Sequence, residues 1–184
     1  KYGYYDQARN QDQTLQVQWN EKVYNFLEDT GIRFQINIHN APVWVAAYYL
    51  PPHVFQSAPV FLLSTDLPEN DYLAQTITHR LYDSNTATKI AQYILLGIGG
   101  AKLIDLLGFE PEVYHLNEAH AAPAIFHLYK KFGSLSEVRK RLIFTTHTPE
   151  EAGNEIHDLY LCDKMGYFLD IPLEQVKMIM GIDN

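Results

Sequence analysis

The sequence predicts an α/β protein built on a parallel, doubly wound sheet. Residues 60–63, 113–116 and 142–146 are short apolar runs, as expected of strands that are buried on both faces. Helical patterns separate the three runs, and the order strand–helix–strand–helix–strand is typical of that fold. We also expect an added antiparallel β-hairpin ahead of these strands, at residues 32–50.

Composition limits the class of protein. A chain of 184 residues with 47% hydrophobic residues can bury one core, and a net charge of -8 disfavours nucleic acid as a partner, because phosphates require a basic face. The single cysteine, Cys162, fits a reducing compartment, and we expect a cytoplasmic protein. Glycines and charges interrupt residues 94–107, so no stretch is expected to span a membrane. The chain begins at Lys1 and reads as an internal piece of a longer protein.

The N-terminal part contains one clear pairing signal. Residues 1–20 are rich in Gln, Asn and Asp without a clear period, so we expect an irregular or weakly stranded opening. Residues 32–38 alternate apolar and polar side chains, which predicts a half-buried strand. A turn signal at residues 40–42 and a second apolar run at residues 43–50 complete the predicted hairpin.

A long helix is predicted over residues 86–107, where apolar residues recur at helical spacing until Gly108. Gly97 and Gly99 lie inside this pattern rather than between a strand and a helix. We therefore interpret them as small residues that let the helix approach its sheet closely, not as a nucleotide-binding loop.

The C-terminal part continues the α/β rhythm. A helix is predicted over residues 118–132, directly after the strand at 113–116, and a short charged helix over residues 136–141. The tail is expected to be rich in loops up to about Leu173 and helical after it. Cys162 has no base in a matching polar cluster, which indicates a buried, unreactive thiol.

Polar clusters follow the three predicted strands, at residues 64–66, 117–120 and 145–148. Carboxyl ends of neighbouring parallel strands meet at one edge of a sheet, so we expect the clusters to form a common rim. The rim holds carboxylates, hydroxyls, an amide and imidazoles, with few cations. Such groups suit the hydroxyls of a sugar, whereas a phosphate would require basic groups.

Structural explanations compete with this reading. Asn117 and Glu118 could simply cap the following helix, and His147 could be a core histidine bonded to a carbonyl. His115, on the strand before the cluster, is expected to pack or to support the site. A zinc site formed by His115, Glu118 and His120 is disfavoured, because their spacing differs from the helical pattern that puts two imidazoles on one face.

Blocks spread over the whole chain resemble the α-glucan (glycogen/starch) phosphorylases. The block at residues 146–154 is similar to the bacterial form that reads Thr-His-Thr-Pro-x-x-Ala-Gly-Asn, and Tyr114 to Ala122 resembles the family's Asn-Asp/Glu-x-His block with its preceding strand. The other blocks occur in the family's order at residues 2–7, 63–71, 80–82 and 96–100.

The resemblance implies part of the N-terminal, glucan-binding Rossmann-like domain of a GT-B fold. The family phosphorolyses α-1,4-glucan with phosphate to glucose 1-phosphate, with retention. It holds pyridoxal phosphate as a Schiff base in a C-terminal domain, so the cofactor lysine would lie outside this chain. We expect the complete enzyme to be a homodimer, and these 184 residues alone to bind no cofactor and to be inactive.

The resemblance also assigns roles to residues. The loop at residues 82–85 matches a mobile segment that gates the cleft, with a looser alignment. The implied catalytic residues are Glu118 and His147, and the implied substrate-binding residues are Asn117, His120, Thr146, Asp83 and Asn85.

The sequence differs from the family pattern in two places, and two alternative functions stay open. Ala119 stands where the family has Gly or Thr, and Glu150 and Glu151 replace the usual Val-Pro, which leaves the preferred oligosaccharide undetermined. The alternatives are a stand-alone carbohydrate-binding module and a segment of a GT-B glycogen synthase, which uses a nucleotide sugar.

Overall fold

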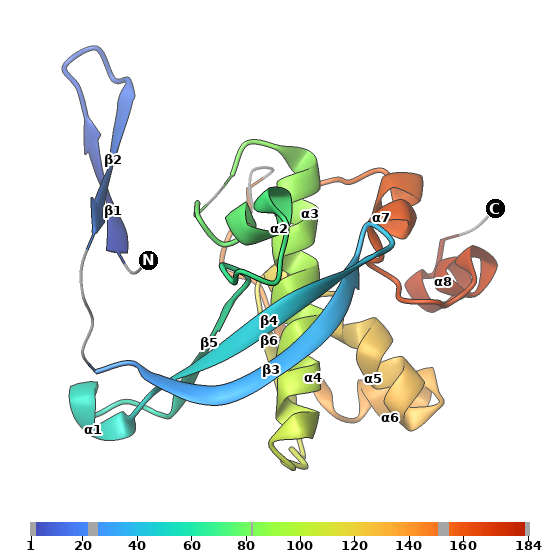
Figure 1. Ribbon diagram of the computed structural model, residues 1–184. Helices are drawn as coiled ribbons and strands as arrows, with labels where there is room; N and C mark the ends of the chain where they lie inside the picture. The colour runs from blue at the N-terminus through green and yellow to red at the C-terminus, as the bar shows by residue number, and fades with distance from the viewer. Residues whose placement is uncertain (1–2, 22–25, 82, 151–154, 183–184) are drawn as a thin grey trace. The chain divides into compact units, whose positions relative to one another are not determined.

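The computed structural model describes residues 3–21, 26–81, 83–150 and 155–182 (Figure 1). The chain divides into two compact units, one formed by Lys1–Gly31 with Tyr48–Leu62 and the other by Ile32–Ala47 with Leu63–Asn184. The elements form small sheets and helices of a mixed α/β protein. The residues of the candidate functional site, described below, lie in the second unit.

The first unit contains a regular hairpin where we expected an irregular or weakly stranded opening. Strands β1 (Gly3–Arg9) and β2 (Leu15–Glu21) pair antiparallel. The connection is a polar turn in which the Asp12 carboxylate accepts hydrogen bonds from the Thr14 backbone N–H (3.0 Å) and hydroxyl (2.6 Å). Among the side chains that the structure describes in this hairpin, Leu15 and Val17 are exposed.

The predicted hairpin at residues 32–50 is confirmed. Strands β3 (Glu28–Ile38) and β4 (Ala41–Leu50) are neighbours in a three-stranded sheet with the order β3-β4-β5. His39 and Asn40 form the two-residue turn with φ of 52° and 60°, the backbone that a right-twisted hairpin requires. Ala41 therefore belongs to β4 and not to the turn. The buried side chains of β3 alternate as predicted: Phe34, Ile36 and Ile38.

The prediction of one sheet containing all three apolar strands was wrong. Strands β6 (Tyr114–Asn117) and β7 (Leu142–Thr145) form the predicted parallel pair, in register from Tyr114 opposite Leu142 to Asn117 opposite Thr145. Strand β5 (Val60–Ser64) instead lies at the edge of the β3-β4-β5 sheet. Its side chains are half exposed, so an apolar run marked an edge strand here and not a strand buried on both faces.

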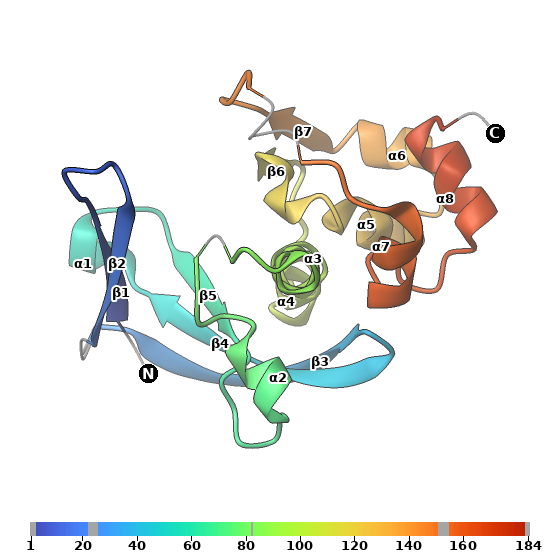
Figure 2. The ribbon, with the colours of Figure 1, turned by 90° about the horizontal axis from the view of Figure 1, so that it is seen from above.

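The long helix over residues 86–107 is confirmed. It runs without a break through α3 (Thr86–Ile94), the π-helical turn η1 (Leu95–Gly99) and α4 (Gly100–Leu106), and it ends before Gly108, whose φ is +71°. Viewed along its axis, it lies between β3 and β4 on one side and β6 and α5 on the other (Figure 2). Ile90 and Ile94 are fully buried in this helix.

The remaining helices agree in part with the sequence. Between β6 and β7 lie the 3-10 turn η2 (Ala119–Ala121), α5 (Ala124–Phe132) and α6 (Leu135–Arg139), close to the two predicted helices. Helix α8 (Leu173–Met180) begins where we predicted. Helix α7 (Leu159–Met165) was missed, although Asp158 caps it by accepting a hydrogen bond from the Leu161 N–H at 2.8 Å.

Cys162 is buried in α7, as predicted, and burial raises the pKa of its thiol to about 11. A thiol with that pKa is a poor nucleophile at neutral pH. Among the described residues, no helix combines the length and the hydrophobicity that a membrane span requires.

Candidate functional site

The ends of β6 and β7 lie side by side, which brings two of the three predicted polar clusters together. Asn117 is opposite Thr145, and the Glu118 N–H extends the ladder by donating to the Thr145 carbonyl oxygen at 2.8 Å. The clusters at residues 117–120 and 145–148 therefore meet at one edge, as expected for parallel strands.

The Glu118 carboxylate binds the loop that follows β7. Its Oε1 accepts a hydrogen bond from the His147 backbone N–H at 2.5 Å and one from the Thr148 hydroxyl at 3.4 Å, and its Oε2 accepts from the Thr146 hydroxyl at 3.1 Å. The His147 N–H, followed by the two hydroxyls, lowers the pKa of Glu118. The carboxylate is therefore ionised at neutral pH and fixes the backbone that carries His147.

The backbone of Glu118 adopts a conformation that favours glycine, with φ of 64° and ψ of 176°. Its side chain caps no helix: η2 has no side-chain cap, and α5 begins only at Ala124, after Pro123. The capping explanation is therefore wrong for Glu118. Strained backbone of this kind concentrates at functional sites, where surrounding contacts maintain it.

His115 supports the same edge from the middle of β6. Its Nε2 lies 2.8 Å from the Thr145 hydroxyl on the paired strand. This hydrogen bond links the side chains of the two strands directly beneath the site. The supporting position that we expected for His115 agrees with this contact. Asn117 and His147 have exposed side chains at the same edge.

A second polar cluster joins His120 to the long helix. The Glu155 carboxylate accepts hydrogen bonds from the Lys89 ammonium group and, at 3.1 Å, from the Tyr93 hydroxyl. The Tyr93 ring makes edge-to-face contacts with His120 (5.3 Å between centroids) and His157 (5.9 Å). The Lys89 hydrogen bond lowers the pKa of Glu155, whereas burial raises the pKa of Tyr93 to about 12.

We did not predict roles for Lys89, Tyr93 or His157. The available signal was the spacing of Lys89 and Tyr93, since residues four apart share one face of a helix. The sequence gives no indication of the partner of that face, because Glu155 is more than sixty positions away.

Asp83 and Asn85 form a turn and a helix cap. The Asp83 carboxylate accepts a hydrogen bond from the Asn85 N–H at 2.8 Å, and the Asn85 side chain accepts one from the Thr88 N–H at 3.0 Å at the start of α3. Within the described residues, these hydrogen bonds stay inside the turn and do not reach the Glu118 cluster. Tyr82, in the same predicted loop, lies outside the described residues.

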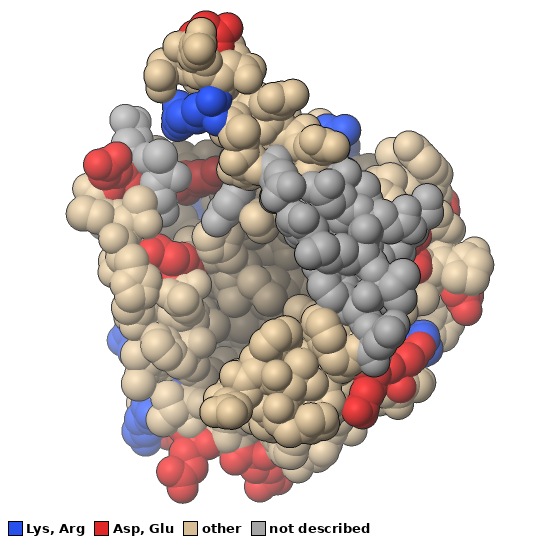
Figure 3. Space-filling model, turned by 90° about the vertical axis from the view of Figure 1, so that its left-hand side faces the viewer, with Lys and Arg blue, Asp and Glu red and all other residues tan. Residues whose placement is uncertain are grey.

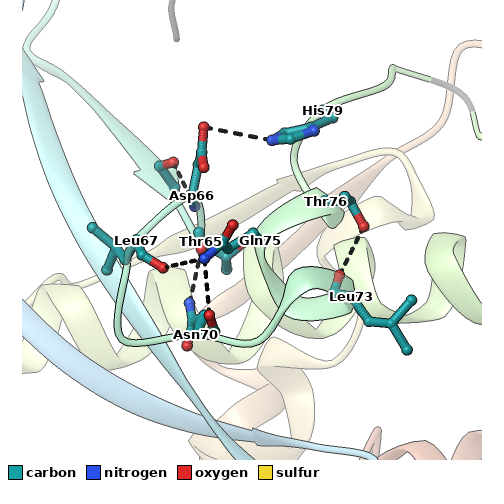
Figure 4. Close-up of polar contacts among 9 residues, drawn as sticks. Thr65, Asp66, Leu67, Asn70, Leu73, Gln75, Thr76 and His79 are labelled. Atoms are coloured by element: carbon teal, nitrogen blue, oxygen red, sulfur yellow. Dashed lines mark hydrogen bonds and ion pairs between the residues drawn. The ribbon is translucent and has the colours of Figure 1, made fainter.

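The third predicted cluster, at residues 64–66, belongs to a structural loop (Figure 4). The Asn70 side chain accepts a hydrogen bond from the Trp44 N–H (2.8 Å) and donates to the carbonyl oxygens of Trp44 (2.8 Å) and Thr65 (2.7 Å). The loop leads to α2 (Tyr72–Thr76), and the Gln75 amide donates back to the carbonyls of residues 67 and 70. This cluster holds a loop to β4 and is not part of the β6–β7 edge.

The charged side chains and the possible metal ligands limit the kinds of ligand that this protein can bind. On the face drawn in Figure 3, small groups of Lys and Arg and small groups of Asp and Glu are scattered among uncharged residues. The part of the chain that the structure describes contains no group of three His, Cys, Asp or Glu residues that could hold a metal ion. The β6–β7 edge presents an ionised carboxylate, hydroxyls, an amide and imidazoles, which can bind the hydroxyl groups of a neutral polar ligand.

Known proteins similar to this chain include two kinds of phosphorylase. The chain is 44% identical over 104 residues to a maltodextrin phosphorylase of Thermococcus litoralis and 31% identical over 176 residues to a glycogen phosphorylase of Mycobacterium tuberculosis. These matches cover 52% and 82% of this chain, and 12% and 20% of the phosphorylases.

A longer match is to an uncharacterized protein of Methanocaldococcus jannaschii, which is 42% identical over 180 residues, or 98% of this chain and 34% of that protein. The chain thus spans about a third of the length of this relative and less of the phosphorylases. No protein-family model and no solved structure matches the chain.

Proposed function

We propose that this chain is a segment of an α-glucan phosphorylase and forms the glucan-facing wall of its active site. The full-length protein would transfer the terminal glucosyl residue of an α-1,4-glucan to inorganic phosphate. In that reaction the bond between C1 and the glycosidic oxygen breaks, a bond between C1 and a phosphate oxygen forms, and the shortened glucan takes up a proton. The similarity to maltodextrin and glycogen phosphorylases supports this choice over a glycogen synthase.

The observation that carries the proposal is the set of hydrogen bonds made by Glu118. Two sequence blocks that resemble the phosphorylases, at residues 114–122 and 143–155, meet through the Glu118 carboxylate and the loop that carries His147. A strained backbone maintained at the junction supports a binding role beyond packing. We assign Asn117, His120 and Thr146 to hydroxyl groups of the glucan.

The proposed roles of the two catalytic residues differ. The exposed His147 contacts the reacting glucose, while Glu118 holds the His147 backbone and places a negative charge near the positive charge that develops at C1. Asp83 and Asn85 would contact the substrate only if their turn opens, because their side chains hydrogen-bond within it.

The groups around Glu118 suit a sugar better than pyridoxal phosphate. That cofactor requires a lysine for its aldehyde and donors for its phosphate, and Lys89 is already paired with Glu155. We therefore propose that the cofactor and the substrate phosphate bind in a C-terminal domain outside these residues. A GT-B architecture, a homodimer and a cytoplasmic location belong to the same proposal.

Assays of the full-length protein test this function. We expect phosphate-dependent release of glucose 1-phosphate from α-1,4-glucan, and we expect Glu118→Gln and His147→Ala each to lower kcat at least about 100-fold, the range for a removed transition-state contact. Cofactor content, measured by absorbance, should stay unchanged. Glu112→Gln, which alters an exposed carboxylate before β6, serves as the matched control. Near-normal phosphorolysis by both site variants would refute the assignment.

A further inference from the structure

The contacts of Glu155 with helix α3 form a two-point attachment. Each oxygen of its carboxylate has its own donor: Oε1 accepts from Lys89 and Oε2 accepts from the Tyr93 hydroxyl at 3.1 Å. Lys89 and Tyr93 lie four residues apart on α3, so both donors project from one face of the helix. The attachment therefore fixes both the position and the rotation of the carboxylate.

The attachment is partly shielded from water. The side chains of Lys89 and Glu155 are 26% and 32% exposed, and His157, whose Nε2 lies 3.2 Å from Glu155 Oε2, is 16% exposed. An ion pair with this degree of shielding is screened less by salt than a pair on the open surface. The pair between Lys130 and Asp170, at 46% and 77% exposure, is an exposed counterpart in the same chain.

The same helix face also supports η2. The edge-to-face contact between Tyr93 and His120 joins α3 to η2. One helical turn further along, a Cβ on Gly97 would lie 2.8 Å from the Ala121 carbonyl oxygen and 2.7 Å from the Ala124 nitrogen, so the backbones are in direct contact there. His120 is thus supported by two contacts between the long helix and the segment that begins with η2. The contact at Gly97 joins two backbones, so the part of this support that can adjust is the Tyr93 ring.

We propose that Lys89, Tyr93 and Glu155, which we call the α3 anchor, are positioning residues for glucan binding. The hydrogen bond to Glu155 fixes the Tyr93 ring, and the ring fixes the imidazole of His120. The anchor acts on the ligand through His120 and does not touch the reacting atoms. This inference rests on the proposed function, since it assigns His120 to the glucan.

Amide hydrogen exchange of the full-length protein tests the anchor without any substrate. The Ala122 N–H, which donates to the Ala119 carbonyl oxygen at 3.0 Å, reports on η2. We expect Tyr93→Ala and Lys89→Met to speed its exchange about 2- to 10-fold, the range for a lost aromatic contact. Lys130→Met, at the exposed pair, should leave it unchanged. Unchanged exchange in both anchor variants would overturn the proposal.

Steady-state kinetics test the consequence for binding. We expect Tyr93→Ala to raise KM for the glucan about 3- to 10-fold, with kcat and KM for phosphate within about 2-fold. Tyr93→Phe, which keeps the ring, should have a smaller effect, and Lys89→Arg, which keeps the ion pair, should restore what Lys89→Met loses. Tyr72→Ala removes a 77% exposed ring and is the matched control.

The outcomes separate the two proposals. A wild-type protein that releases no glucose 1-phosphate refutes the proposed function, while the exchange data still decide whether the α3 anchor holds η2. A fall in kcat at unchanged KM for the glucan would overturn the assignment of the anchor to binding. Faster exchange in η2 together with a raised KM for the glucan would support both steps.

Discussion

Gly97 is the position where one added carbon has the largest predicted effect on both stability and site geometry. A Cβ there would lie 2.7 Å from the Ala124 nitrogen, 2.8 Å from the Ala121 oxygen and 3.0 Å from Pro123 Cδ. Two of these atoms belong to the backbone, so the clash cannot be relieved by rotating a side chain. Overpacking of this kind costs up to about 3 kcal/mol, against a gain of about 1 kcal/mol from replacing a helical glycine by alanine.

We therefore expect Gly97→Ala to destabilise the protein by about 2 kcal/mol, which lowers Tm by about 4–8 °C for a chain of this size. Gly100→Ala is the matched control, because Gly100 is in the same continuous helix and a Cβ there meets nothing within 4 Å. It should stabilise by about 0.5–1 kcal/mol. Thermal unfolding followed by circular dichroism measures both variants.

The opposite signs of the two glycine variants make the test decisive. If Gly97→Ala raised Tm as Gly100→Ala does, the close approach of η1 to residues 121–124 would be refuted. Because the clash pushes on Ala121, next to His120, we also expect Gly97→Ala to raise KM for the glucan in the full-length protein. Gly100→Ala should leave that KM unchanged.

Three further predictions follow from buried or paired polar groups. Asn70→Ala should destabilise by about 2–3 kcal/mol in urea unfolding, since three hydrogen bonds to backbone groups are lost. Asn70→Asp should cost at least as much, because it keeps the acceptor for the Trp44 N–H but places a buried carboxylate oxygen against the carbonyl oxygens of Trp44 and Thr65. Partial burial acts to raise the pKa of Asp105, but hydrogen bonds from Lys131 and His127 lower that pKa overall. The Tm difference between wild type and Asp105→Asn should therefore have its full size above about pH 5 and should shrink as pH falls below about 4. The reason is that a carboxylate with a depressed pKa loses its contribution to stability when it is protonated. Cys162, with a pKa of about 11, should react with a thiol reagent at pH 8 at least about 100-fold more slowly than in the unfolded chain, and equal rates would contradict its burial.

The sequence predicted best where one face of an element is buried. The alternation in β3, the helical spacing over residues 86–107 and the order around β6 and β7 all reflect contact with a core, and the structure confirms them. The β1–β2 hairpin was not predicted as regular, although Leu15, Val17 and Trp19 alternate with polar residues in β2, because that period-2 signal is only three apolar residues long. The prediction that β5 lies in the same sheet as β6 and β7 was wrong, because an apolar edge strand and a central strand can have the same short apolar sequence.

For the candidate site, the sequence identified the strand ends but not the way in which they are connected. Parallel pairing made it predictable that residues 117–120 and 145–148 would meet. Local patterns suggested that Glu118 caps a helix, yet its carboxylate binds the loop of His147 and its backbone has a φ of 64°. No spacing rule in the sequence specifies whether a polar residue after a strand caps a helix or binds a neighbouring loop.

The π-helical turn η1 links the stability of the fold to the geometry of the site. Gly99 faces β3 and β5, where a Cβ would meet Ile36 and Leu63, whereas Gly97 faces the backbone of residues 121–124. Widening the helix over residues 95–99 changes the angular spacing of its side chains, and the two glycines occupy opposite contacts two residues apart. We predicted that the glycines let the helix approach one sheet closely, and the helix in fact makes two close approaches. Gly99 faces the sheet of β3 and β5, and Gly97 faces residues 121–124, which follow His120 directly. A side chain at Gly97 would require the backbone of residues 121–124 to shift, whereas one at Gly99 would require the end of the Leu63 side chain to move by a few tenths of an ångström.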